Sequence, residues 1–311
     1  MKFYVAVTDD EWFAFLKRRK PDEVNFWRPG GQTFSALSMG EPFLFKLHAP
    51  NNYIVGGGFF VRYTKLPLSM VWKVFGEKNG TDQHDGFTRK IFSYLNLDRQ
   101  RILDPEIGCV ILGMPFFFER EDWIPIPANW SSNIVSGKRY DTSEQIGRDL
   151  WARVEPILFR QGIGDQPKKH GRLSEQEPRY GTKYFVETRF GQSAFRTMVI
   201  DAYGRRCAVS GEKTVPVLEA SHIKPYAESG PNTPQNGILL RADLHILFDQ
   251  GYLAITNKYQ IEISRRIKEE YENGRDYYKY NGNYLNSLPL RVEERPASEF
   301  LQWHQEKVFK G

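Results

Sequence analysis

Residues 219–251 constrain the fold of this chain more than any other stretch. Residues 217–222 favour a strand that ends at His222 and is stopped by Pro225, and a second short strand is expected to begin at Asn236. Residues 244–250 predict a helix of about two turns, with Gly251 as the residue that ends it. Together these segments predict a compact unit of strand, loop, strand and helix.

A cluster of potential ligands is expected where these segments meet. His245 and Asp249 are four positions apart, so a helix projects both from one face. Ser221 and His222 come from the strand expected to pack against that helix. Imidazole and oxygen ligands suit a hard or borderline divalent ion. The segment therefore predicts a metal pocket made by Ser221, His245 and Asp249, with His222 beside it.

These residues resemble the HNH nuclease family, whose catalytic unit is the ββα-metal fold. The matching features are Ser-His-Ile-x-Pro at 221–225, Asn-Gly at 236–237, and His245 with Asp249. The first histidine, the asparagine, the second histidine and the aspartate follow one another at separations of 14, 9 and 4 positions. The resemblance covers about residues 191–304. Three flanking segments resemble the restriction-enzyme branch of the family: 206–211, 288–290 and 303–304.

The resemblance implies a role for each residue. His222 is expected to be the general base, because imidazole titrates near neutral pH, and main-chain partners are expected to hold its tautomer. His245 is expected to bind the metal ion. Asn236 is expected to support catalysis by tying the loop between the strands to the backbone. The implied cofactor is one divalent ion, Mg²⁺, Mn²⁺ or another transition metal, and the implied reaction is hydrolysis of a DNA phosphodiester bond.

Two positions depart from the family pattern. Ser221 stands where the family often has Asp or His, and a hydroxyl is a poor ligand. Its contact with the ion can therefore run through water, with Asp249 or Glu219 supplying the carboxylate. Cys207 is followed three positions later by Ser210 rather than by a second cysteine, so no structural zinc is expected.

Basic residues are candidates for contacts with DNA phosphates. The formal net charge of +5 favours a polyanionic partner, although charge alone is weak evidence. Lys224 and Arg241 lie beside the ligand cluster in sequence, and Lys168 and Lys169 lie in a segment rich in Gly, Pro and basic residues. The alternative for each is an ordinary solvated surface charge. The change in composition predicts three parts: residues 1–142, a helix and basic linker at 143–188, and a nuclease domain at 189–311.

The first part resembles the EVE domains of the PUA superfamily in its segments 3–7, 39–45 and 54–60, a likeness that covers about residues 1–140. It implies a small β-barrel with helices, and hence an α+β fold class for the chain. Such domains hold a flipped, modified base in an aromatic cage, which compensates for the unstacking of that base. The expected cage residues are Trp27, in a loop over residues 25–31, and Trp72, with Phe26 and Tyr53 behind them. The alternative for each of these rings is a role in the core.

A reader fused to an HNH nuclease resembles the modification-dependent, type IV-like restriction endonucleases. The resemblance implies base flipping and cleavage of double-stranded DNA that carries 5-methyl- or 5-hydroxymethylcytosine. Because two strands must be cut, a homodimer is expected. The sequence shows neither a signal peptide nor a membrane-spanning stretch, which predicts a cytoplasmic protein without a membrane partner. The alternatives are an HNH endonuclease that ignores modification and a non-catalytic module that binds modified bases or RNA.

Overall fold

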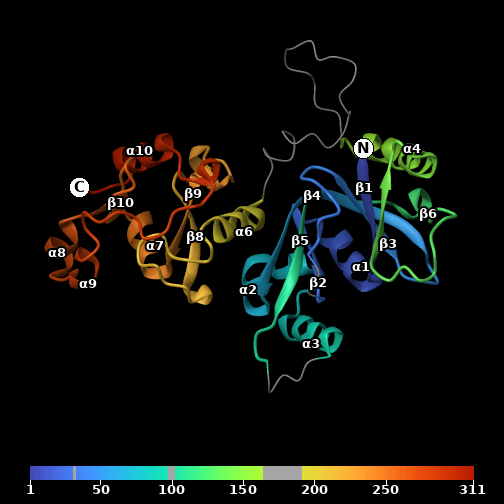
Figure 1. Ribbon diagram of the computed structural model, residues 1–311, viewed down its shortest axis with the longest axis horizontal. Helices are drawn as coiled ribbons and strands as arrows, with labels where there is room; N and C mark the ends of the chain where they lie inside the picture. Colours follow the sequence, from blue (N-terminus) through green and yellow to red (C-terminus); the bar gives the residue numbers. More distant parts are fainter. Residues whose placement is uncertain (31–32, 97–101, 164–190) are drawn as a thin grey trace, which may run out of the picture. The chain divides into compact units, whose positions relative to one another are not determined.

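The computed structural model describes residues 1–30, 33–96, 102–163 and 191–311, and Lys168 and Lys169 lie outside these ranges. The chain divides into two compact units, Met1–Arg189 and Phe190–Gly311. Figure 1 draws the first in blue to green and the second in yellow to red. The first unit is built on a large sheet with helices, and the second holds a short strand pair followed by a helix. The α+β fold class expected from the sequence is confirmed.

The sheet of the first unit has the strand order β2-β5-β4-β3-β1-β7, and β6 pairs with β4. Strands β1 and β3 run parallel, whereas the other neighbours are antiparallel. The strands are β1 (Lys2–Thr8), β2 (Glu23–Arg28), β3 (Pro42–Leu47), β4 (Tyr53–Pro67), β5 (Glu106–Phe117), β6 (Ile124–Pro125) and β7 (Gly137–Asp141).

The glycines of β4 let this strand pass close to both neighbours. A Cβ atom at Gly57 would lie 2.5 Å from the carbonyl oxygen of Phe43 and 2.6 Å from the ring of Phe116. The register also shifts on either side of Phe59, which bends the long β4–β5 pair. The expected loop at 25–31 is corrected here, because residues 25–28 belong to β2 and pair with β5.

Among the described residues, the α-helices of the first unit are α1 (Asp10–Arg19), α2 (Leu68–Phe75), α3 (His84–Leu95) and α4 (Gln145–Arg160). Helix α1 begins where the Asp9 carboxylate accepts a hydrogen bond from the Trp12 amide, 3.0 Å away. Its buried face places Trp12, Phe13 and Leu16 in a core that also holds aromatic residues of β3. The first unit therefore has a large hydrophobic core of its own.

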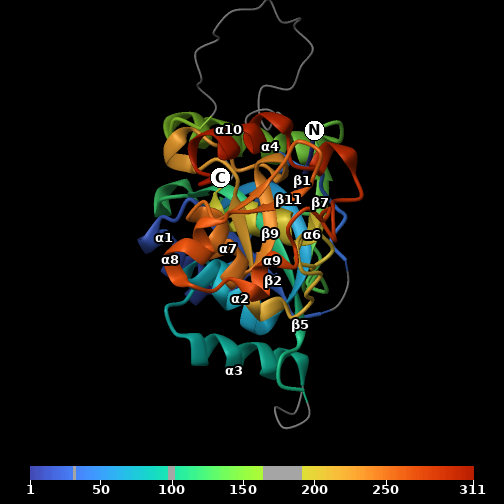
Figure 2. The same ribbon diagram turned by 90° about the vertical axis from the view of Figure 1, so that its left-hand side faces the viewer.

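The second unit contains the strand-loop-strand-helix segment that the sequence predicts. Its elements are α6 (Gln192–Ala202), β8 (Leu218–His222), β9 (Gly237–Arg241), α7 (Ala242–Asp249), β10 (Leu253–Ile255), β11 (Ile261–Ile263), α8 (Arg266–Tyr271), α9 (Arg275–Tyr278) and α10 (Ser298–Lys307). Strands β8 and β9 are antiparallel, with His222 opposite Gly237. Helix α7 follows β9 directly and packs on both strands (Figure 2).

Helix α6 covers the strand pair closely. Its residues Phe195, Met198 and Val199 are buried, and a Cβ atom at Gly237 would lie only 2.3 Å from Cγ2 of Val199. A glycine at the start of β9 therefore allows α6 to pack directly on the strand. Within the described ranges, none of the helices combines the length and apolar character needed to span a lipid bilayer.

Candidate active site

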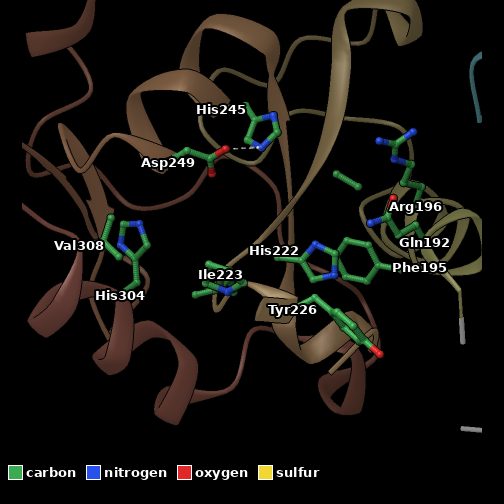
Figure 3. A pocket seen from close by; sticks show the side chains of 12 residues that line it. Gln192, Phe195, Arg196, His222, Ile223, Tyr226, His245, Asp249, His304 and Val308 are labelled. Atoms are coloured by element: carbon green, nitrogen blue, oxygen red, sulfur yellow. Dashed lines mark ion pairs between the residues drawn. The ribbon is translucent and has the colours of Figure 1, made fainter. Parts of the chain in front are cut away.

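The second unit contains a cavity of about 470 Å³ that gathers the polar residues of the ββα segment. Figure 3 shows side chains from α6, β8, α7 and α10 around it. It is lined by Gln192, Phe195, Arg196, Ala220, His222, Ile223, Pro225, Tyr226, His245, Asp249, His304 and Val308. The structure thus brings His222, His245 and Asp249 to one cavity, although 27 positions separate the first from the last.

His245 is held between two carboxylates. Its Nδ1 atom lies 2.8 Å from Oε2 of Glu219 on β8, and its Nε2 atom lies 3.1 Å from Oδ2 of Asp249, one helical turn away (Figure 3). Burial disfavours the charged ring, but the hydrogen bonds to Asp249 and Glu219 outweigh it and raise the pKa of His245. The ring is therefore fixed at both nitrogens.

The Ser221 hydroxyl contacts the carboxylate of Asp249. Its side chain is 1% exposed, and its Oγ atom lies 3.3 Å from Oδ1 of Asp249 and 3.2 Å from the main-chain oxygen of His222. A hydroxyl donates to either oxygen. In this structure Ser221 is thus a neighbour that orients Asp249.

His245 and Asp249 fit the binding of one small divalent ion. Adjacent ligands of an octahedral ion with bonds of about 2.1 Å lie roughly 3 Å apart, and the Nε2 and Oδ2 atoms are 3.1 Å apart. Among the described residues, no group of three or more His, Cys, Asp or Glu side chains is arranged to hold a metal ion. The remaining ligands would therefore be water and substrate oxygens, which Mg²⁺ commonly retains.

His222 stands apart from the two carboxylate-bound nitrogens. Its Nε2 atom lies 2.8 Å from Oδ1 of Asn232, and its ring stacks on Phe195 with centroids 3.7 Å apart and planes inclined by 12°. The expectation of a main-chain partner is corrected, since this partner is a side-chain amide. Burial lowers the pKa of His222, the bond to Asn232 opposes that effect, and the charge of Arg196 adds to it. The ring is therefore neutral around pH 7.

Asn236 closes the loop between β8 and β9. Its side chain is fully buried, with Oδ1 accepting from the Lys224 amide at 2.8 Å. Its Nδ2 atom donates to the main-chain oxygens of Lys224 and Pro231, at 2.8 and 3.0 Å. One amide side chain thus connects the two ends of the loop that leads from His222 to Asn232.

His304, from α10, forms another part of the cavity wall. It is 3% exposed and stacks on Phe248 with centroids 3.8 Å apart and planes inclined by 8°. Its Nε2 atom donates to the Phe248 carbonyl at 3.0 Å, while its buried Nδ1 atom has no hydrogen-bond partner. Burial lowers the pKa of His304 to about 4. The ring is therefore a neutral packing element.

The basic residue that the structure places at the cavity differs from those expected from the sequence. Arg241 forms a fork with Asp243, at 2.6 and 2.7 Å, and this pair raises the pKa of the guanidinium. The Lys224 ammonium lies over the Trp303 ring, 5.8 Å from its centroid. Neither residue lines the cavity, whereas the exposed Arg196 of α6 does. Sequence reasoning missed Arg196 because nothing in its own helix connects it to residues 222–249.

A second cavity, of about 570 Å³, lies in the first unit. Trp27 and Phe26 line it, together with Val7, Thr8, Asp9, Trp12, Arg28, Pro29, Gly30, His48, Tyr94, Val135 and Ser136. Trp72 does not, because its ring packs against His84 and Phe87. Tyr53 instead contacts the ring of Trp123. The structure thus brings two of the four expected cage residues to one cavity.

The sequence of the ββα segment matches a family of known proteins. Residues 207–256 match a family model described as HNH endonuclease. This stretch is an HNH endonuclease domain, and the class of protein that its fold and site define is a nuclease.

The search of curated protein sequences found no match. Among solved structures, the chain is similar to ASCH from Zymomonas mobilis at 10% identity and a TM-score of 0.33, covering 48% of this chain and 94% of that one. It is also similar to the modification-dependent TagI restriction endonuclease at 13% identity and a TM-score of 0.26, covering 92% of this chain and 75% of that one.

Proposed function

We propose that this protein is a metal-dependent restriction endonuclease that hydrolyses DNA carrying 5-methyl- or 5-hydroxymethylcytosine. The observation that carries the proposal is the convergence of His222, His245 and Asp249 on one cavity of an HNH endonuclease domain. A neutral imidazole and a separate ligand pair are the two groups that such hydrolysis requires.

In this proposal His222 takes a proton from the attacking water. Its lowered pKa keeps the ring neutral around pH 7, so it is ready to accept that proton. His245 and Asp249 would hold a divalent ion, which when bound supplies positive charge beside the scissile phosphate. Glu219 and Ser221 orient those two ligands through the contacts described above. Asn236 supports the loop that carries the partner of His222.

Several basic residues would contact the DNA backbone. Arg196 is the best placed, because it is exposed and lines the cavity one position from the ring that stacks on His222. Lys224, Lys168 and Lys169 remain proposed phosphate contacts. Arg241 would have to break its fork with Asp243 to serve in this way, which makes it the weakest of the set.

The cavity of the first unit is the proposed reader of the modified base. Phe26, Trp27, Trp12 and Tyr94 offer rings for stacking, and polar side chains such as Arg28 offer hydrogen bonds to base edges. A flipped base must regain the stacking and hydrogen bonds that it loses in the duplex, and such a wall can supply both. Trp72 and Tyr53 are not part of this proposed reader, since they do not line the cavity.

The test is digestion of matched plasmids, one with methylated or hydroxymethylated cytosine and one without, in the presence of Mg²⁺ or Mn²⁺. Cleavage of the modified plasmid alone, abolished by His222→Ala, would support both parts of the proposal. Equal cleavage of both plasmids would support the nuclease activity and exclude recognition of a modified base. If no divalent ion supports cleavage, a binding module for modified bases or RNA becomes the better interpretation, and competition between RNA and duplex DNA would identify its ligand.

We also propose that the active form is a homodimer, because one HNH centre cuts one strand at a time. Sedimentation in the presence of cognate DNA should show two copies per duplex. A monomer that accumulates only nicked circles would contradict this assembly.

A further inference from the structure

We propose that Asn232 is a positioning residue that selects the tautomer of His222, so that Nδ1 is the atom that receives the proton of the attacking water. The inference deepens the proposed function and rests on it, since it takes His222 to be the general base. The motif around residues 221–249 does not identify Asn232, and its part in the site follows only from its contact with the ring.

The chemistry of the contact determines where the ring proton lies. Oδ1 of Asn232 lies 2.8 Å from Nε2 of His222. An amide oxygen can only accept a hydrogen bond, so Nε2 must be the donor. In a neutral imidazole only one nitrogen carries a proton. Nδ1 is therefore left with a free electron pair, which is the property a general base needs.

Phe195 fixes the plane in which this selection operates. Its buried ring lies nearly parallel to that of His222, at 3.7 Å and 12°. A half-turn of the imidazole about its Cβ–Cγ bond would keep the stacking but move Nε2 away from Asn232. The stacking on Phe195 therefore defines the plane of the His222 ring, and the hydrogen bond makes the Nε2 edge of the ring face Asn232.

Three contacts hold the loop residues just before Asn232 in place. Asn236 binds the carbonyl oxygen of Pro231, the residue just before Asn232, at 3.0 Å. Gly230 packs so closely on the carbonyl oxygen of Lys224 that a Cβ atom there would lie 1.9 Å from it. The amide of Gly230 also binds the carbonyl oxygen of Pro225 at 3.0 Å. The position of Asn232 is thus built into the loop.

Charged groups around the ring come from two helices. Arg196 of α6 faces His222 from one side, and His245 and Asp249 of α7 act on it from the other. A cation and an anion beside the ring affect its charge, but neither determines which nitrogen of a neutral ring carries the proton. That selection requires a directional partner, and Asn232 is the partner within hydrogen-bond distance.

The test compares Asn232→Leu, which removes the acceptor at similar size, with Asn232→Asp, which keeps an oxygen acceptor. Full-length protein labelled with ¹⁵N-histidine is measured with the rings neutral, and the His222 signal is assigned from its absence in His222→Ala. We expect the Nε2–H tautomer in the unsubstituted protein and in Asn232→Asp, and a mixture of tautomers in Asn232→Leu. Asn257→Leu, at an exposed position of the same unit, should leave the spectrum unchanged.

Cleavage kinetics supply the second measurement. General bases typically contribute about 10²–10⁴-fold to rate, so kcat of Asn232→Leu should fall by at least about tenfold with KM unchanged, and Asn232→Asp should recover most of the loss.

An Nδ1–H tautomer in the unsubstituted protein, or an unaltered tautomer and kcat in Asn232→Leu, would overturn the proposal. Full activity in His222→Ala would instead refute the base itself, while the tautomer spectra would still decide whether Asn232 positions the ring. Thermal unfolding of each variant checks that the fold is intact, and Asn232→Ala replaces the leucine variant if that one does not fold.

Discussion

At the scale of single residues, two histidines in one cavity have opposite pKa shifts because their partners differ. Burial disfavours the charged form of both rings. His245 is bonded to the carboxylates of Asp249 and Glu219, and their negative charge more than offsets the burial. His222 is bonded to a neutral amide, which does not offset it. One cavity therefore holds a histidine whose burial favours the neutral ring and another whose carboxylate partners favour the charged ring.

Replacing Glu219 by alanine should weaken metal binding. Glu219 holds Nδ1 of His245, and loss of such an outer partner typically costs about 10–100-fold in metal affinity or activity. Calorimetric titration with Mn²⁺ measures the change, with Glu269→Ala at an exposed position of the same unit as the control. Equal affinity in the two variants would show that Glu219 does not orient the ligand.

His304 should make the stability of the second unit fall in acid. Its pKa is lowered by burial from 6.5 to about 4, so the unfolded chain binds the proton first as the pH falls. The full stability is present above pH 6.5, is lost progressively down to about pH 4, and changes no further below that value through this group. The shift corresponds to about 3 kcal/mol at its limit.

Urea unfolding measured across this pH window would show the effect as a slope of the unfolding free energy against pH. His304→Phe keeps a ring to stack on Phe248 but cannot be protonated, so its slope should be shallower. Identical slopes in the two proteins would mean that His304 does not contribute to the acid sensitivity.

At the scale of elements, the catalytic geometry depends on how closely α6 packs on β8 and β9. Gly237 makes this approach possible, and its absent side chain would occupy space filled by Val199 and by the ring of Phe195. Because Phe195 stacks on His222, the packing of α6 also determines the plane of that ring. The helix therefore contributes to the site through the packing of Phe195 and Val199.

Replacing Gly237 by alanine should lower both stability and kcat. The new methyl group would lie 2.3 Å from Cγ2 of Val199 and 3.0 Å from the Phe195 ring, so α6 must move. Overpacking of this kind typically costs about 1–3 kcal/mol, measured here by urea unfolding.

The matched rescue is the double variant Gly237→Ala with Val199→Ala, which removes the nearest clashing methyl group. Its loss of stability should be smaller than the sum of the two single losses, a coupling that a double-mutant cycle reports. Strict additivity would show that the α6 contact is not the source of the effect.

At the scale of the whole molecule, each compact unit holds one of the two cavities described above, and these differ in character. The first is lined by four aromatic rings together with polar and small residues, whereas the second combines three histidines, Asp249 and Arg196 with apolar residues. Stacking and hydrolysis place different demands on their surroundings, because one needs flat apolar walls and the other needs polarised protons and charge. Recognition and cleavage should therefore respond separately to substitution.

Replacing Trp27 by alanine should reduce selectivity for modified DNA without disabling the nuclease. Stacking of a base on an aromatic ring is worth about 1–3 kcal/mol, so affinity for a modified duplex should fall by about 5- to 150-fold. Fluorescence anisotropy with modified and unmodified duplexes measures this, and Mn²⁺ titration checks that the second cavity is unchanged. Tyr53→Ala, an aromatic outside the cavity, is the control and should retain selectivity. Loss of selectivity in Tyr53→Ala with none in Trp27→Ala would place the reader elsewhere.

Local sequence was sufficient to predict the ββα unit and its main polar residues. Pro225 limits the strand that ends at His222, and a spacing of four places His245 and Asp249 on one face of α7, because both rules depend only on neighbouring positions. In the first unit, the loop expected over residues 25–31 was wrong, because residues 25–28 belong to β2. The conformation of β2 depends on pairing with β5, far along the chain.

Tertiary structure decided which residues complete the two cavities. The ring of His222 is contacted by Phe195, from a separate helix, and by Asn232, from a loop. The same helix brings Arg196 to the cavity. No periodicity in the sequence connects these residues to His222. Likewise, the sequence does not distinguish among the four aromatic residues expected in the cage, Trp27, Trp72, Phe26 and Tyr53. Only packing places two of them, Phe26 and Trp27, at the first cavity. Spacing along the chain encodes contacts within one element, whereas contacts between elements depend on side chains that meet only when the chain has folded.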